Sequence, residues 1–142
     1  MAYWLMKSEP DVFGWPDLKK KVEQWHGVRN YVARNNMKAM KLGEKAFFYH
    51  SNIGKEIVGI MRVVALAHPD STAELKNGKV VWECVDVVAD TELPRPVTLE
   101  EIKAEPKLSK MILVNNSRLS VQPVTDDEWK LICRMAGLKA AP

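Results

Sequence analysis

The pattern of apolar and polar side chains predicts four β-strands, and in the first two of them the side chains alternate between two faces. The expected strands cover residues 3–7, 44–52, 56–68 and 79–89. The nearly unbroken apolar run at 56–68 indicates a strand that is covered on both faces. Residues 52–55 include a glycine and connect two of these strands as a hairpin. The polar stretch 70–78 ends on Asn77-Gly78, which is a turn signal.

Helical periodicity and capping residues predict four short helices. The expected helices cover residues 15–25, 30–41, 98–105 and 125–136. Asn30 is a good N-cap for the second of them. Thr98 with Glu101, and Thr125 with Glu128, have the spacing of a capping box.

Long strands and short helices that do not alternate regularly predict an α+β fold. We expect a curled, mostly antiparallel sheet or small barrel with helices packed around it, and we expect Pro94 and Pro96 to end the last long strand. The chain has 142 residues, of which 46% are apolar, and this is enough for one core. A single domain over residues 1–142 follows, with a tail that frays from about residue 138.

The composition and the sequence patterns argue against several classes of protein. No apolar run approaches a membrane span and the N-terminus lacks a signal-peptide pattern, so we expect a cytoplasmic protein. Cys84 and Cys133 lie inside apolar patterns, which predicts buried thiols. The three histidines share no ligand spacing with cysteines or acids, so neither a metal nor a cofactor is expected. The net charge of +3 permits contact with a phosphate backbone without requiring it.

Polar clusters interrupt the apolar elements at four places: Lys7-Ser8-Glu9, Arg29-Asn30 with Asn35-Asn36, His50-Ser51-Asn52, and Asn115 to Ser120. Three of them follow a strand end or begin a helix, where side chains can converge on one mouth. Amides, hydroxyls and a carboxylate suit the hydrogen-bonding edge of a heterocycle. Trp4, Tyr31 and Tyr49 lie beside these clusters. Stacking combined with edge hydrogen bonds is the usual way to hold an unpaired base.

Each of these features also has a purely structural explanation. Strand tryptophans are more often core than stacking surface, and short polar residues commonly cap helices, form ion pairs or shape turns; this applies to Trp4, Asn30, Glu9 with Lys7, and Ser51-Asn52. A basic stripe at helical spacing is more often a solvated face than a phosphate track, which applies to Arg34, Lys38 and Lys41.

Four segments resemble the signature blocks of the EVE domain family, in the same order and at the right separations: YWLMKSEPD, WHGVRNYVARNNMKAM, FFYHSNIGKEIVGI and SRLSVQPVTDDEW. The resemblance runs from residue 2 to about residue 136. It implies a PUA-like fold, which is an open, mostly antiparallel β-barrel flanked by short helices. EVE domains are similar to YTH domains, which read methylated adenine in RNA. The sequence matches YTH domains at Lys7-Ser8, Phe47-Phe48 with Ser51-Asn52 and Gly59, and Ser117-Arg118.

The resemblance implies that a pocket at the barrel mouth binds a modified nucleobase of DNA or RNA. Carried onto this chain, the pocket residues are Trp4, Lys7, Ser8, Glu9, Arg29, Asn30, Tyr31, Asn35, Tyr49, His50, Ser51, Asn52, Ser117, Arg118 and Ser120. Arg34 and Lys38 would contact phosphates. His26 stands where the family generally has an acidic residue, at a position that we expect to be peripheral. No tryptophan follows Tyr31 closely, so the methyl cage of YTH domains and their preference for N6-methyladenine are not carried over.

The sequence therefore predicts a non-catalytic, monomeric binding module whose partner is nucleic acid with a modified base. Within this hypothesis, Glu9 or the amide of Asn35 reads the Watson–Crick edge of the base. A sensor of a free nucleoside or metabolite ranks second. An enzyme that uses Ser8, Lys7 and His50 ranks third, because the chain has no nucleophile elbow, metal cluster or paired acids on one element.

Overall fold

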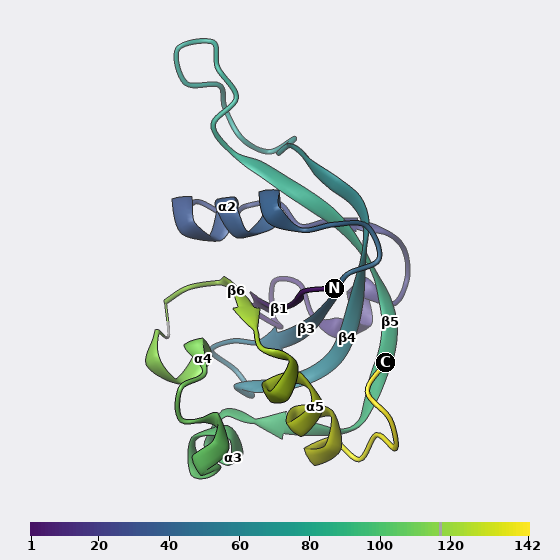
Figure 1. Ribbon diagram of the computed structural model, residues 1–142. Helices are drawn as coiled ribbons and strands as arrows, with labels where there is room; N and C mark the ends of the chain where they lie inside the picture. Colours follow the sequence, from purple (N-terminus) through teal and green to yellow (C-terminus); the bar gives the residue numbers. More distant parts are fainter. Residues whose placement is uncertain (117) are drawn as a thin grey trace.

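A computed structural model describes residues 1–116 and 118–142, and it has one six-stranded sheet with helices on both faces (Figure 1). The strands are β1 (Tyr3–Ser8), β2 (Glu23–Gln24), β3 (Lys45–His50), β4 (Glu56–Pro69), β5 (Glu83–Thr98) and β6 (Val121–Val124). The helices are α1 (Trp15–Leu18), α2 (Tyr31–Ala39), α3 (Leu99–Ala104), the 3-10 helix η1 (Pro106–Leu108), α4 (Ile112–Asn115) and α5 (Asp126–Met135).

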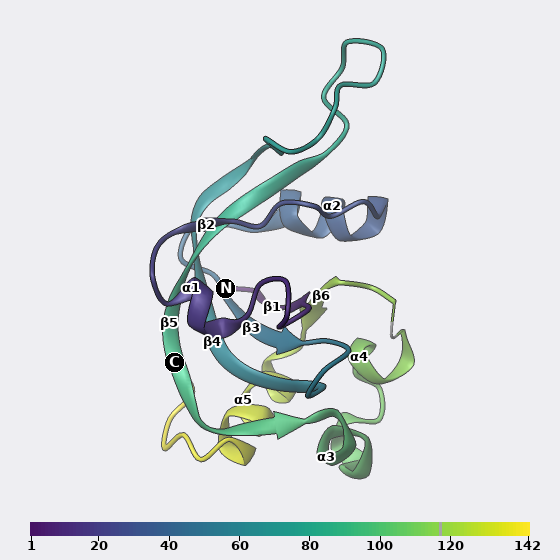
Figure 2. The ribbon, with the colours of Figure 1, turned by 180° about the vertical axis from the view of Figure 1, so that it is seen from behind.

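The strand order is β2-β5-β4-β3-β1-β6, and only the β1–β3 pair is parallel among the described strands. Long, curved β4 and β5 wrap around the shorter strands, as the two opposite views show (Figures 1 and 2). The predicted α+β class and the mostly antiparallel, open PUA-like sheet are confirmed.

The sheet buries a separate apolar cluster on each face. Trp4 and Met6 of β1 are buried on the face covered by α2, together with Met37 of that helix. Leu5, between them in the chain, is buried on the opposite face beside Trp129 of α5. Because alternate residues of a strand point to opposite faces, β1 contributes to both clusters.

Capping residues fix the starts of the helices where the sequence predicts them. The side chain of Asn30 accepts a hydrogen bond from the Ala33 amide at 2.9 Å and begins α2. Capping boxes at Thr98 and Thr125 begin α3 and α5. These three helix starts are confirmed, since their determinants lie within one turn of the chain.

The expected helix over residues 15–25 is wrong beyond its first turn. Only α1 is helical, and the chain then turns and forms β2 against β5. The amide of Trp25 donates to the carbonyl of Val85 at 2.9 Å, which extends this pairing by one residue. The long-range pairing outweighs local helix propensity here, because it also buries the Trp25 indole.

The expectation that Pro94 and Pro96 end sheet structure is also wrong, because β5 continues to Thr98. Residues 93–96 bulge out of the ladder opposite the single residue Val58 of β4. A bulged residue does not have to donate a ladder hydrogen bond, so proline is tolerated there.

A glycine in β4 lets α1 lie directly on the sheet. A Cβ atom added at Gly59 would overlap the six-membered ring of Trp15, whose indole nitrogen donates to Glu92 at 3.0 Å. Trp15 is buried and also packs edge-on against Phe48, with ring centroids 5.6 Å apart. The absence of a side chain at Gly59 is therefore a packing requirement.

We expect Gly59→Ala to lower the free energy of unfolding by about 1–3 kcal/mol, because the added methyl group displaces a packed indole. Urea denaturation of the wild type and the variant measures this change. The matched control is the same substitution in a Trp15→Leu background, where it should cost much less. An equal cost in both backgrounds would show that Trp15 is not the obstacle.

Candidate functional site

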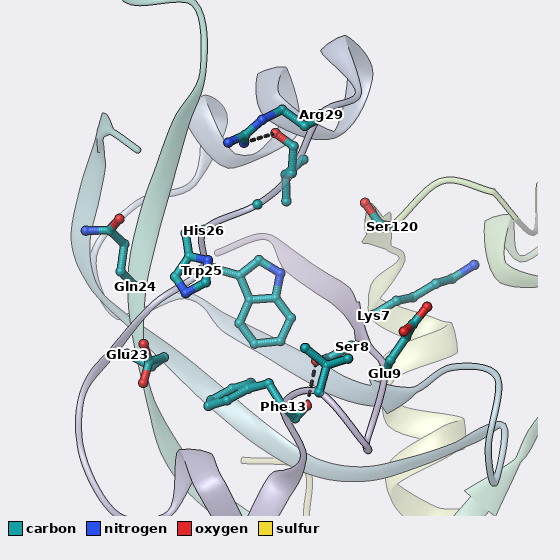
Figure 3. Close-up of a pocket in the computed structure, with 13 residues that line it drawn as sticks. Lys7, Ser8, Glu9, Phe13, Glu23, Gln24, Trp25, His26, Arg29 and Ser120 are labelled. Atoms are coloured by element: carbon teal, nitrogen blue, oxygen red, sulfur yellow. Dashed lines mark hydrogen bonds between the residues drawn. The ribbon is translucent and has the colours of Figure 1, made fainter. Parts of the chain in front are cut away.

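A cavity of about 400 Å³ opens beside the end of β1, between the turn that follows this strand and the segment that precedes α2 (Figure 3). A volume of this size lies within the range of small-molecule sites. Its lining residues are Lys7, Ser8, Glu9, Val12, Phe13, Glu23, Gln24, Trp25, His26, Gly27, Val28, Arg29 and Ser120.

Aromatic and aliphatic side chains form the inner wall of the cavity. The Trp25 indole lies in the middle of this wall, with Phe13 beside it (Figure 3). The two rings meet edge to face, with centroids 6.2 Å apart. Phe48 supports Trp25 from the core in a similar geometry, at 5.4 Å. Trp25 is only 6% exposed, and these contacts fix the orientation of the part of the indole that lines the cavity.

Hydrogen bonds to β1 hold the polar side of the cavity in place. The amide of Lys7 donates to the carbonyl of Ser120 at 2.8 Å, and the carbonyl of Ser8 accepts from the Ser51 amide at 2.9 Å. The hydroxyl of Ser8 donates to the carbonyl of Phe13 at 2.6 Å. These bonds join the end of β1 to the segments next to it, so Lys7 and Ser120 face one opening.

Lys7 and Glu9 place opposite charges at this opening. Partial burial lowers the pKa of the Lys7 ammonium group, which lies 5.9 Å from the centre of the Tyr49 ring. A carboxylate oxygen of Glu9 accepts a hydrogen bond from the side-chain amide of Asn52 at 2.7 Å. Asn52 has a φ of 63°, a conformation that asparagine tolerates better than most residues. A donor and an acceptor thus stand side by side at the rim.

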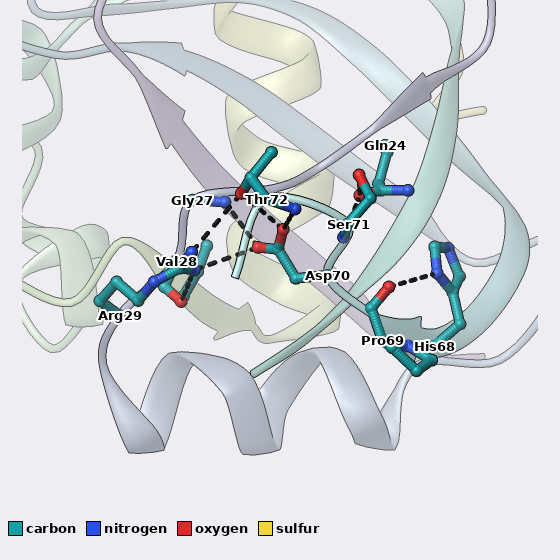
Figure 4. Close-up of polar contacts among 9 residues, drawn as sticks. All are labelled: Gln24, Gly27, Val28, Arg29, His68, Pro69, Asp70, Ser71 and Thr72. Carbon is teal, nitrogen blue, oxygen red and sulfur yellow. Dashed lines mark hydrogen bonds and ion pairs between the residues drawn. The ribbon is translucent and has the colours of Figure 1, made fainter. Parts of the chain in front are cut away.

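A buried carboxylate holds the backbone of the cavity wall in place through hydrogen bonds. Asp70 accepts hydrogen bonds from the Gly27 amide at 2.8 Å, from both the amide and the hydroxyl of Thr72, and from Arg29 at 3.1 Å (Figure 4). Burial alone would raise the pKa of Asp70, but these donors lower it to about 2. Gly27 itself has a φ of 87°, which suits glycine. Asp70 therefore fixes the backbone between Trp25 and Arg29.

The structure brings some of the predicted site residues together at this cavity. Lys7, Ser8, Glu9, Arg29 and Ser120 line it. Asn52 and Ser51 lie just behind the rim and contact Glu9 and Ser8. Ser117 lies outside the described residues.

Other predicted pocket residues are placed elsewhere, and for these the expected convergence is wrong. Trp4 is buried in the core, where its indole nitrogen donates to Glu44 at 3.0 Å. Tyr49 is buried on the opposite face of β3, because it is one residue out of phase with Phe48. His50 accepts a hydrogen bond from the amide of Trp15 at 3.1 Å, and burial lowers its pKa, so it positions α1.

The predicted residues at the start of α2 and within it, and Arg118 beyond α4, also lie off the cavity wall. Asn30 serves as the helix cap, and Tyr31 packs on Trp82 with centroids 4.9 Å apart. The side-chain oxygen of Asn35 accepts from Arg34, on the exposed side of α2. Arg118 lines a separate, smaller depression of about 100 Å³ beside Asn30.

Sequence reasoning missed the apolar wall of the cavity, above all Phe13 and Trp25. It also treated His26 as peripheral, although His26 lines the cavity. The useful signal was the Trp-His-Gly run just before Arg29 in the second block. Once the supposed helix over 15–25 is removed, this run sits in an extended segment where its side chains can face a cavity.

The two cysteines were predicted to be buried, and the structure agrees. Cys84 and Cys133 are buried free thiols, as predicted, and burial raises their pKa values to about 12 and about 11. Within the described residues, no group of His, Cys, Asp or Glu side chains is arranged to hold a metal ion. None of the described helices has the length and apolar character that crossing a membrane requires.

The open, mostly antiparallel sheet flanked by short helices defines a PUA-like fold. The family model of the EVE domain matches residues 2–135, so the chain belongs to the EVE domain family. The resemblance in the sequence blocks is thereby confirmed.

Known proteins similar to this chain include bacterial and human members. An X-ray structure of a protein from Agrobacterium tumefaciens is 53% identical, with a TM-score of 0.92 over 100% of this chain and 99% of that chain. Human thymocyte nuclear protein 1 is 38% identical over an alignment 162 positions long, which covers 92% of this chain and 72% of the human protein. A crystal structure of human THYN1 in complex with DNA containing 5-methylcytosine is 35% identical, with a TM-score of 0.87 and 100% of both chains covered.

We expect Asp70→Asn to lower the free energy of unfolding by about 2 kcal/mol at pH 7, because the wild-type carboxylate is stabilised by its donors. The folded-state pKa is depressed, so this stabilisation is complete above the ordinary value of 3.8 and is lost as the pH falls through about 2.

Denaturant titrations of both proteins between pH 7 and pH 2 measure the difference, which should shrink in the acid part of this range. Asp11→Asn, at an exposed carboxylate, is the control and should change stability little. A wild-type advantage that persists unchanged to the lowest pH would contradict the role given to the ionised Asp70.

Proposed function

We propose that this EVE domain is a non-catalytic module that binds a modified nucleobase of DNA in the cavity at the end of β1. The observation that carries the proposal is the cavity itself, in which a fixed indole stands opposite a rim with Lys7, Glu9 and Ser120. The likeness to human THYN1, whose structure contains 5-methylcytosine DNA, supports DNA and makes 5-methylcytosine the first candidate.

Both stacking and hydrogen bonding contribute to the free energy of binding the base. Stacking on an aromatic side chain is worth roughly 1–3 kcal/mol per base, whereas extruding a base from a duplex costs a few kcal/mol. Stacking on Trp25 alone therefore barely offsets extrusion. Hydrogen bonds from the rim and contacts with the flanking backbone supply the remainder.

The rim chemistry favours a base with an exocyclic amino group. Glu9 can only accept hydrogen bonds, and cytosine offers its amino group as a donor. The Lys7 ammonium group can only donate, and the neighbouring ring nitrogen and carbonyl of cytosine accept. A base with a carbonyl in place of the amino group would face Glu9 with an acceptor.

The methyl group of the base would be read by the apolar wall. Burying one methyl-sized group yields about 0.8 kcal/mol, only a few-fold in affinity. Val12, Phe13 and Val28 provide such a surface. Useful discrimination also needs a penalty for the unmodified base, such as a water trapped against these side chains.

Two side chains that an enzymatic alternative would use are engaged in structural hydrogen bonds. The hydroxyl of Ser8 donates to a main-chain carbonyl, and the imidazole of His50 accepts from a main-chain amide. This favours a binding role over a nucleophile–base pair. Incubation with oligonucleotides that contain 5-methylcytosine should leave them unaltered by mass spectrometry, and a modified product would overturn this part of the proposal.

We expect Trp25→Leu to weaken binding of a duplex with one 5-methylcytosine by about 5- to 150-fold, because the stacking surface is lost while an apolar side chain remains. Fluorescence anisotropy measures the affinity, and circular dichroism checks that the variant is folded. Tyr3→Leu is the matched control, since Tyr3 stacks on Trp129 on the other face of the sheet. Equal affinities for wild type and a folded Trp25→Leu variant would remove the cavity from the binding site.

We expect Glu9→Gln to reduce the preference for 5-methylcytosine over thymine about tenfold, because an amide can donate to the thymine carbonyl as well as accept. Competition binding with two duplexes that differ only at this base gives the preference. Glu100→Gln, at an exposed position on α3, is the control. An unchanged preference would mean that Glu9 does not contact the base edge.

A further inference from the structure

The chain between β4 and β5 forms an arm, residues 70–82, that projects beyond α2 (Figures 1 and 2). Its tip is a tight turn in which Lys76 and Lys79 exchange two main-chain hydrogen bonds of 3.0 and 2.9 Å. Asn77 and Gly78 between them have φ values of 50° and 73°, which is the geometry of the predicted hairpin turn. Both lysines are exposed.

The base of the arm is fixed to α2 and to the cavity wall. Asp70 pairs with Arg29, which also lines the cavity. Arg34 of α2 donates to the carbonyl of Val81 at 2.9 Å. Trp82, the last residue of the arm, packs against Tyr31 of α2. Its ring lies 5.7 Å from the guanidinium of Arg29. The arm is thus held in a defined direction relative to the cavity.

Basic side chains occur at the cavity, along α2 and at the tip of this arm, where Lys76 and Lys79 accompany one exposed acid, Glu74. Residues 24–43 contain no Asp or Glu, but they include four Lys or Arg residues, among them Arg29 and Arg34. The hydrogen-bond acceptors of Arg34 are an amide oxygen and a carbonyl, both neutral, so its charge is not cancelled by them. Lys38 differs, since it pairs with Glu83 at 3.4 Å.

We infer that the arm is a second contact surface, on which Lys76 and Lys79 bind the phosphates of the duplex that flanks the extruded base. This inference rests on the proposed function and deepens it. Six residues of extended chain from Asp70 to Lys76 reach at most about 20 Å. At about 3.4 Å per base pair, the tip can meet phosphates up to about six base pairs along the duplex from the start of the arm at Asp70. Arg29 and Arg34 lie beside the base of the arm.

The arm also exposes apolar side chains, Leu75 and Val80, which a protein partner could cover. The two lysines at the tip outnumber the one exposed acid of the arm, Glu74, and Arg34 beside the arm has only neutral partners, which favours nucleic acid instead. Contact between two copies through the arm is an outcome that the experiment must be able to detect.

The test compares Lys76→Gln/Lys79→Gln with wild type on two probes. One is a duplex with a central 5-methylcytosine and about ten base pairs on each side, which is longer than the reach of the arm. The other is a single-stranded trinucleotide with 5-methylcytosine in the middle, which can reach the cavity only. Lys103→Gln/Lys107→Gln carries the same change of charge at exposed positions near the opposite end of the molecule (Figure 1).

Loss of two phosphate contacts should reduce the slope of log K against log salt by about 1.8 on the duplex. A four-fold rise in salt should then cost the variant about tenfold less affinity than it costs the wild type. The trinucleotide should bind both proteins equally, and the control pair should behave as wild type on both probes.

An unchanged slope on the duplex would overturn the inference while leaving the cavity proposal intact, provided that the trinucleotide still binds. Equal losses on both probes would also overturn it, because the arm would then act through the cavity. Self-association of the wild type that disappears in the arm variant, measured by sedimentation, would assign the arm to a second copy. If neither probe binds the wild type, the proposed function itself fails.

Discussion

The candidate site depends on one buried carboxylate. Asp70 lies 43 residues along the chain from the Gly27 amide and 41 from Arg29, yet it binds both. It is almost fully buried, and an ionised carboxylate is stable there because Gly27, Thr72 and Arg29 donate four hydrogen bonds to it. The same contacts orient the cavity wall and the root of the arm. One electrostatic arrangement therefore sets two surfaces that are distant in sequence.

The cavity is built from the ends of elements, whereas the elements themselves are supported by the core. Strand β1 ends between β3 and the segment before β6, and its last residues, Lys7 and Ser8, line the cavity while still paired with β3. Trp25 follows a two-residue edge strand and is supported by Phe48. Side chains held in fixed positions are what a site needs in order to discriminate between similar ligands.

Much of the fold could be predicted from the sequence, because its determinants are local. The caps at Asn30, Thr98 and Thr125 and the turn at Asn77-Gly78 involve residues within one turn of each other. The failures involve partners far away in the chain. A two-residue strand such as β2 has no periodicity of its own, and its existence depends on β5. The prolines of β5 are tolerated because of the bulge opposite Val58.

The site was predictable where polar residues follow a strand end, as at Lys7, Ser8 and Glu9. It was not predictable where the face of the sheet decides whether a side chain reaches the cavity. Trp4 and Tyr49 are aromatic residues of a suitable kind, but both are buried in the core.

The two apolar clusters on opposite faces of the sheet have a consequence for the evolution of such domains. Side chains around the cavity can vary while the cluster beneath α5 continues to secure the fold, because distant substitutions act nearly independently. The same scaffold can therefore diverge toward other ligands without first being rebuilt.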